Sequence, residues 1–143
     1  MPVIERALDS DRTAIENLLL SNSLPLDGLE LALPTAVVAG GSEGIVGCAA
    51  VEPYGSDGLL RSVCVVEELR GTGLGRELVA ATEQLAAAIG VSELYLLTET
   101  AEAWFLRLGY VSVARDAVPV SLMASPEFSG ACPDSAAVLH KTL

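Results

Sequence analysis

The sequence has little positive charge, and no apolar run in it is long. Of 143 residues, eight are Lys or Arg and 19 are Asp or Glu, so the net charge is −11. Nucleic acids and anionic membrane surfaces are bound through basic patches, which argues against both as partners. No apolar run approaches the roughly 18 to 20 residues that span a bilayer. The N-terminal segment lacks a basic region followed by an apolar one, so we expect no secretory signal and a cytoplasmic protein.

Potential metal ligands are also few. The cysteines are Cys48, Cys64 and Cys132, and the one histidine is His140. None of them stand at the short spacings that are typical of zinc sites. We therefore expect buried, reduced thiols and no metal.

The acidic excess leaves one further interpretation open. In a cytoplasm of high salt, self-repulsion between acidic groups is tolerable, because at about 1 M salt charges are screened over ~3 Å. A stability that depends on KCl concentration would support this hypothesis.

Hydrophobic periodicity and turn residues predict one α/β domain that spans 1–143. The expected fold is a single mixed, mostly antiparallel sheet with helices on both faces, because hairpins come first and a strand-helix-strand crossover follows. The turns between the early strands are expected at 40–44 and 53–58. A long connection, 115–135, contains three prolines and is of the length that often shapes a site. The strands are predicted at 2–7, 35–39, 45–52, 59–66, 94–97, 110–114 and 136–140, and the main helices near 10–21, 74–89 and 101–108.

The segment Val63–Arg76 carries the most information. An apolar, β-branched stretch ends at two acids, and three glycines at alternating positions then lead into a helix. The first backbone N–H groups of a helix lack intrahelical partners and lie at the positive end of its dipole, so this place favours an anion. We call Arg70–Arg76 the glycine loop. It lacks the Lys-Ser/Thr pair of a P-loop, and its third glycine is misplaced for a dinucleotide fingerprint.

The order of these motifs resembles the GNAT superfamily of acetyl-CoA-dependent N-acetyltransferases. Arg70-x-x-Gly73-x-Gly75 matches its pyrophosphate loop, and 103–110, which ends in Leu-Gly-Tyr, matches its second motif. The resemblance implies that the backbone of the fourth strand bonds the pantetheine arm and that the glycine loop holds the pyrophosphate. Thr98 stands where many relatives have Asn. The implied cofactor-binding residues are Val63, Val65, Arg70, Gly71, Thr72, Gly73, Leu74, Gly75, Arg76, Thr98 and Phe105.

A narrower resemblance concerns substrate. The segments 59–63, 94–102, 126–129 and 132–136 are similar to those of the small GNAT branch associated with arsenic-resistance operons. This resemblance implies a role in resistance or detoxification.

The expected reaction is attack of a neutral amine on the acetyl thioester, which needs a base, an oxyanion donor and an acid. Glu52, at the expected end of a strand, is the predicted catalytic base. Arg61 lies inside a strand and needs a partner. That partner is either Glu52 or an acidic group of a small, amino-acid-like substrate. Phe105 stands where many relatives carry a Tyr acid, so water is the alternative proton donor for the thiolate.

A different class of function also fits these residues. The chain could bind CoA without catalysis, as a sensor or an assembly subunit. The final strand or the connection 115–135 could also support a homodimer.

Overall fold

Within residues 2–42 and 44–143, which the computed structural model describes, seven strands form one sheet in the order β1-β2-β3-β4-β5-β7-β6. Only β4 and β5 run parallel, and every other neighbouring pair is antiparallel. The predicted mixed, mostly antiparallel sheet is therefore confirmed. The strands are β1 (Val3–Arg6), β2 (Ala36–Gly41), β3 (Gly44–Tyr54), β4 (Asp57–Val65), β5 (Glu93–Thr98), β6 (Val111–Ser112) and β7 (Ala137–Thr142).

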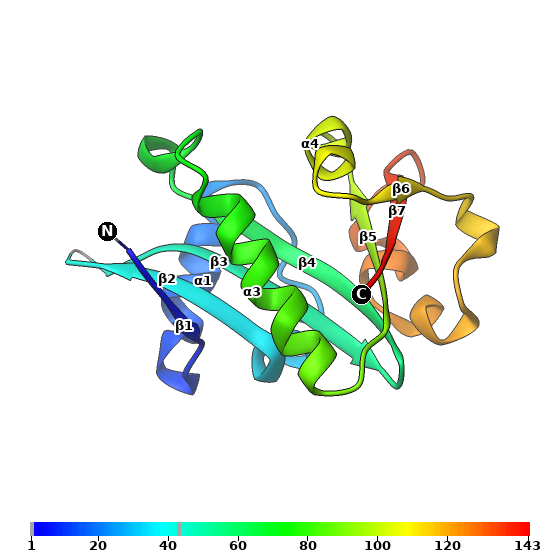
Figure 1. Cartoon of the computed structure of the whole chain (residues 1–143), viewed down its shortest axis with the longest axis horizontal. Helices are drawn as coiled ribbons and strands as arrows, with labels where there is room; N and C mark the ends of the chain where they lie inside the picture. Colours follow the sequence, from blue (N-terminus) through cyan, green and yellow to red (C-terminus); the bar gives the residue numbers. More distant parts are fainter. Residues whose placement is uncertain (1, 43) are drawn as a thin grey trace.

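Helices cover both faces of this sheet (Figure 1). In β2, Val37 and Ala39 pack with side chains of the α3 helix, whereas Val38 between them packs with α1. This alternation follows from the two-residue period of a strand. The helices are α1 (Arg12–Ser21), α2 (Leu29–Ala32), α3 (Leu74–Ala88) and α4 (Glu102–Arg107). Among the described residues, no helix is both long and apolar enough to cross a membrane.

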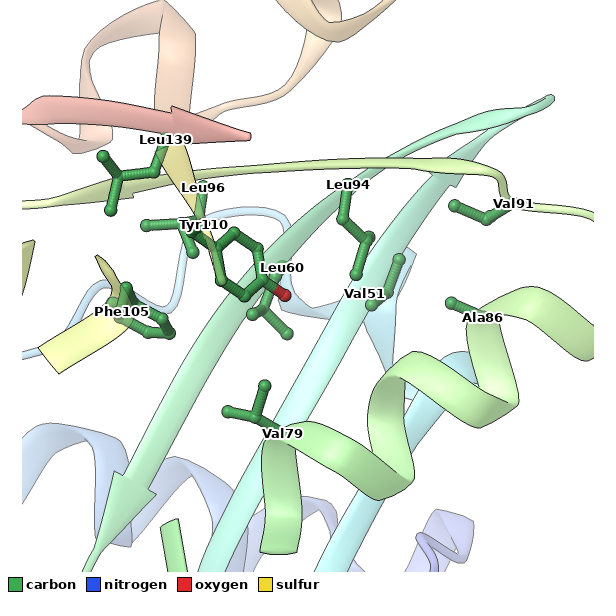
Figure 2. Close-up of a cluster of buried hydrophobic side chains, with 10 residues drawn as sticks. All are labelled: Val51, Leu60, Val79, Ala86, Val91, Leu94, Leu96, Phe105, Tyr110 and Leu139. Atoms are coloured by element: carbon green, nitrogen blue, oxygen red, sulfur yellow. The ribbon is translucent and has the colours of Figure 1, made fainter. Parts of the chain in front are cut away.

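The largest core cluster joins the two halves of the sheet. Val79 and Ala86 of α3 pack against Leu94 and Leu96 of β5, with Tyr110 between the helices and β7 (Figure 2). Tyr110 is 1% exposed, and its hydroxyl donates to Glu83 Oε2 at 2.8 Å. Tyr110 is therefore a core residue whose one polar side-chain atom, the hydroxyl oxygen, is hydrogen-bonded to a side chain of α3.

Several predicted boundaries differ from the structure by one or two residues. β3 runs through Pro53 to Tyr54, because Tyr54 pairs with Asp57 and leaves a two-residue turn. Gly55 provides the positive φ, +68°, that this turn needs. The strand predicted at 110–114 shortens to β6, since Tyr110 turns into the core. The hairpin predicted at 40–44 lies between Gly41 and Gly44, and its Glu43 is outside the described residues.

An irregularity in β4 opens the sheet. Cys48 pairs with Cys64, but Ala50 pairs with Arg61, so β4 holds one extra residue between these pairs. Ser62 lies at that β-bulge with φ +59°, and bulges bend and twist a strand. β4 then pairs with β5 only over Asp57–Leu59. Beyond Leu59 the two parallel strands separate.

Candidate functional site

The separation of β4 and β5 creates a cavity of about 970 Å³. Its walls are Leu60–Val65 of β4 and Leu96–Thr98 of β5, and the glycine loop and α4 border it. Residues 22–25 also line it, as do Glu127, Cys132 and Ala136 of the late chain. The cavity thus connects the predicted anion site to the residues around Arg61.

The glycine loop forms one end of the cavity. Gly71 and Gly73 have φ angles of +80° and +92°, and a Cβ at either position would meet no atom within 4 Å. The space over both glycines is open to a ligand. The first N–H that bonds back into α3 is that of Glu77, to Gly73 O at 3.1 Å. The amides of residues 74–76 consequently have no intrahelical acceptor and suit a phosphate group.

Positive charge is concentrated around this cavity. Among the residues that the structure describes, four basic ones line it, half of the eight in the chain, against only two acidic ones. Arg70 is held in place, since its Nε donates to Val65 O at 3.2 Å and its Nη2 to Asn22 Oδ1. In a molecule of net charge −11, this arrangement attracts a polyanion to one place. The four lining arginines are Arg61, Arg70, Arg76 and Arg107.

The β4 wall offers backbone hydrogen bonds. Antiparallel pairing with β3 uses one edge of β4, and pairing with β5 stops at Leu59. Peptide groups on the other edge, beside Val63 and Val65, have no strand partner among the described residues and border the cavity, and the Val65 carbonyl accepts from Arg70 Nε. Such groups can bond an extended amide chain or a developing oxyanion.

The other predicted cofactor residues divide into two groups. Thr98 and Phe105 line the cavity, and Thr98 Oγ1 also accepts the Ala101 N–H at 3.0 Å. Thr72 and Leu74 do not line it. The Thr72 hydroxyl donates to Leu69 O at 2.6 Å. Leu74, the first residue of α3, is buried in the core between α3 and the sheet. Trp104, which sequence reasoning left out, lines the cavity and stands 3.1 Å from an ideal Cβ on Gly75.

Arg61 and Glu52 form a buried ion pair on the sheet face opposite α3. Arg61 Nη1 donates to Glu52 Oε2 at 2.6 Å, and neither side chain has any exposed area. Glu52 lies inside β3 rather than at its end, and its other oxygen accepts the Tyr54 hydroxyl at 2.6 Å. Glu52 does not line the cavity. Of the two partners considered for Arg61, the geometry supplies the internal one.

Glu127 was not singled out from the sequence, yet it lines the cavity near Arg61. Its Oε2 lies 3.4 Å from Arg61 Nε, and the residue is 4% exposed. Burial raises the pKa of this carboxyl to about 7, against the lowering effect of Arg61. The available signal was the one charged residue of the segment 117–133, an acid between Pro126 and Phe128. No cluster of three or more metal-ligating side chains occurs in residues 2–42 and 44–143.

None of the three tyrosines lines the cavity as the structure describes it. Burial raises the pKa of Tyr54 to about 12, with a further contribution from Glu52. The pKa of Tyr110 is also raised, mainly by burial. Phe105 packs edge-on against Trp104 and Tyr110, at 4.8 and 5.6 Å between ring centres. A proton for a leaving thiolate therefore has no tyrosine source in this wall.

Known proteins resemble the chain over a segment that includes β4, the glycine loop, β5 and α4. The model of the acetyltransferase (GNAT) domain matches residues 34–112. An amino-acid acetyltransferase of Ralstonia nicotianae is 39% identical over 77 residues, which are 52% of this chain and 17% of that protein. The uncharacterized N-acetyltransferase CT2212 of Chlorobaculum tepidum is 34% identical over 76 residues, or 52% of this chain and 48% of that one. The match thus spans less than half the length of either curated relative.

Solved structures share the whole fold. N-acetylglutamate synthase from Neisseria gonorrhoeae, complexed with coenzyme A and N-acetyl-glutamate, superposes with a TM-score of 0.84 at 22% identity, over 100% of this chain and 35% of that one. Rv2747 from Mycobacterium tuberculosis, in complex with CoA and NLQ, gives 0.79 at 23% identity, over 99% of both chains. The family match covers more than half of the sequence, and the fold agrees over its full length. The chain belongs to the GNAT family of acetyltransferases.

Proposed function

We propose that this chain transfers an acetyl group from acetyl-CoA to the amine of a small molecule, and that amino acids are the first class of acceptor to test. One observation carries the proposal. A single cavity joins an anion-binding helix start to a strand with free peptide groups and to a buried carboxylate. Acetyl transfer from CoA needs these three features in that order.

The cavity residues fit acetyl-CoA by their chemistry. The amides at the start of α3, together with Arg70 and Arg76, suit the pyrophosphate, and the open glycines leave it room. The free edge of β4 beside Val63 and Val65 suits the pantetheine arm. Thr98 and Phe105 belong to the same wall. When bound, acetyl-CoA supplies an acetyl group that is activated as a thioester.

The reaction then makes three demands on the protein. The acceptor ammonium must lose a proton, the new C–N bond must form as the C–S bond breaks, and the thiolate must be protonated. Backbone N–H groups of β4 stabilise the carbonyl oxygen as charge develops on it. Water supplies the proton to the thiolate, because Phe105 has no hydroxyl and the tyrosines lie elsewhere.

The choice of amino acids rests on two relatives. The curated match from Ralstonia nicotianae is an amino-acid acetyltransferase, and the gonococcal neighbour is an N-acetylglutamate synthase. The sequence predicts Glu52 as the base and Arg61 as a substrate ligand, but the two are buried in an ion pair and Glu52 does not line the cavity. The link to arsenic resistance and the homodimer stay predictions.

Turnover on a defined amine panel tests this function. The purified chain is incubated with acetyl-CoA and each standard amino acid, and N-acetylated product and free CoA are measured by mass spectrometry. We expect equal amounts of both products for at least one amino acid. Tight CoA binding with no acetylated product on any amine would contradict the proposal and favour a sensor.

A further inference from the structure

A series of paired polar groups leads from β3 to the part of the cavity wall that Arg61 and Glu127 form. Tyr54 donates to Glu52, Glu52 pairs with Arg61, and Arg61 Nε lies 3.4 Å from Glu127 Oε2. These groups come from β3, β4 and the turn at 127–131, far apart in the sequence. Buried charges are costly unless they are paired, so the presence of three charged groups in this series needs an explanation.

Of this series of polar groups, Arg61 and Glu127 line the cavity, whereas Tyr54 and Glu52 do not. Two carboxylates line the cavity as far as the structure describes it, Glu99 and Glu127, and Glu52 is not among them. Glu99 is exposed on the side of β5, whereas Glu127 is almost fully buried. Glu127 is also the one whose partner, Arg61, directly precedes the bulge of β4. Glu127 thus lines the same cavity as Val63 and Val65, the part of β4 proposed to stabilise the oxyanion.

Arg61 is bonded in a way that leaves Glu127 accessible. Its Nη1 donates to Glu52 Oε2 and to Asp27 O, at 2.6 and 2.5 Å, and its Nη2 to Pro25 O at 3.0 Å. The Nε donates to Ser62 Oγ at 3.2 Å, and its 3.4 Å contact with Glu127 is the longest that the guanidinium makes. An ionised carboxylate has about four lone-pair sites, so Glu127 keeps capacity to accept a proton. Arg61 thus orients Glu127 without neutralising it fully.

The backbone on both sides fixes this arrangement. The Glu127 N–H donates to Ser125 Oγ at 3.2 Å. An ideal Cβ on Gly28 would lie 2.7 Å from Pro126 Cγ, so the loop before α2 and the turn that carries Glu127 are in close contact. The loop in turn supplies the carbonyls that hold Arg61.

We propose that Glu127, and not Glu52, is the general base that takes the proton from the acceptor amine. The inference rests on the proposed function. One proton moves from the ammonium to the Glu127 carboxylate, and the nitrogen lone pair forms the C–N bond while the C–S bond breaks. Glu127 then releases the proton to water. Arg61 and Glu52 are positioning residues, which act through Glu127.

The groups that face Glu127 set its protonation. Arg61 comes from β4, Glu52 from β3, Asp27 from the loop before α2, and Cys132 follows on the same segment. Burial raises the pKa of Glu127 most, Arg61 and a bond from Cys132 lower it, and Glu52 and Asp27 raise it. With a resulting pKa of about 7, a substantial fraction is carboxylate at neutral pH.

The pH dependence of kcat/KM tests the assignment. We compare the wild type with Glu127→Gln, Glu52→Gln and Glu99→Gln, using acetyl-CoA and an amino acid that the wild type acetylates. The wild type should lose activity as the pH falls below about 7, which is the pKa of Glu127. Glu127→Gln should lose about 10²- to 10⁴-fold in kcat/KM together with this acidic limb. Glu52→Gln should keep the limb but move it to lower pH, because Glu52 raises the pKa of Glu127.

Two controls separate the possible failures. Glu99→Gln removes the other cavity carboxylate and should leave the limb in place. Trp104 is the only tryptophan and borders the cavity, so its fluorescence reports CoA binding, which Glu127→Gln should retain. Wild-type activity in Glu127→Gln, or an unmoved limb in Glu52→Gln, would overturn the inference. A wild type that acetylates no amine would overturn the proposed function, and this inference with it.

Discussion

At the scale of single residues, Gly73 and Gly90 stand at the two ends of α3 with φ angles of +92° and +97°. A Cβ at either position would meet nothing within 4 Å. Alanine in place of each glycine should therefore lower the free energy of unfolding by a similar amount, about 1 kcal/mol. Only Gly73→Ala should also weaken CoA binding, because only Gly73 borders the cavity. Chemical denaturation and titration of Trp104 fluorescence measure the two effects. Equal CoA affinity in both variants would contradict the proposed phosphate site.

Glu127 should also make stability depend on pH. Its pKa is raised from 4.5 to about 7 by folding, so its stabilising contribution is full below pH 4.5 and is lost as pH rises through 7. Across this window, the free energy of unfolding of the wild type should fall by roughly 3 kcal/mol relative to Glu127→Gln. Denaturation of both variants at several pH values measures the difference. Parallel curves would show that Glu127 titrates normally.

Residues of the site differ in how well the sequence predicts them. The glycine loop could be predicted, because positive φ and free helix amides need glycines at fixed spacings. The partners of Arg61 could not, because Glu52, Asp27 and Glu127 meet it only in three dimensions. Glu52 was expected at a strand end, but the hairpin continues two residues further and buries it.

At the scale of elements, the bulge of β4 opens the cavity, and Ser62 holds it with φ +59°. A β-branched residue tolerates this conformation least. We expect Ser62→Val to be less stable than Ser62→Ala by about 1–3 kcal/mol, although both lose the same hydroxyl. Thermal denaturation of the two variants measures the difference. Equal stability would mean that β4 relaxes without the bulge.

Periodicity predicted most helices and strands because each buries one face. It did not predict the bulge, because the positive φ of a single serine, Ser62, does not change the hydrophobic pattern. Nor did it resolve 115–135, where the chain forms short turns around Val118 and Leu122 in place of long elements. Both features contribute to the cavity wall, Ser62 from the bulge and Glu127 and Cys132 from 115–135.

At the scale of the whole molecule, charge is unevenly distributed. The net charge is −11, yet half of the basic residues line one cavity. Screening of acidic self-repulsion should raise the melting temperature as KCl increases toward about 1 M, while it weakens the attraction of CoA. Thermal melts and Trp104 titrations across the same salt series measure both. A melting temperature that is indifferent to salt would contradict the hypothesis of a high-salt cytoplasm.

The most direct test of the central claim is a crystal structure of the full chain with acetyl-CoA. We expect the pyrophosphate on the amides of residues 74–76, the pantetheine along the open edge of β4, and the thioester carbonyl at the backbone of Val63–Val65, within reach of an acceptor amine that contacts Glu127. A cofactor bound outside the split between β4 and β5, or a thioester remote from Glu127, would contradict it.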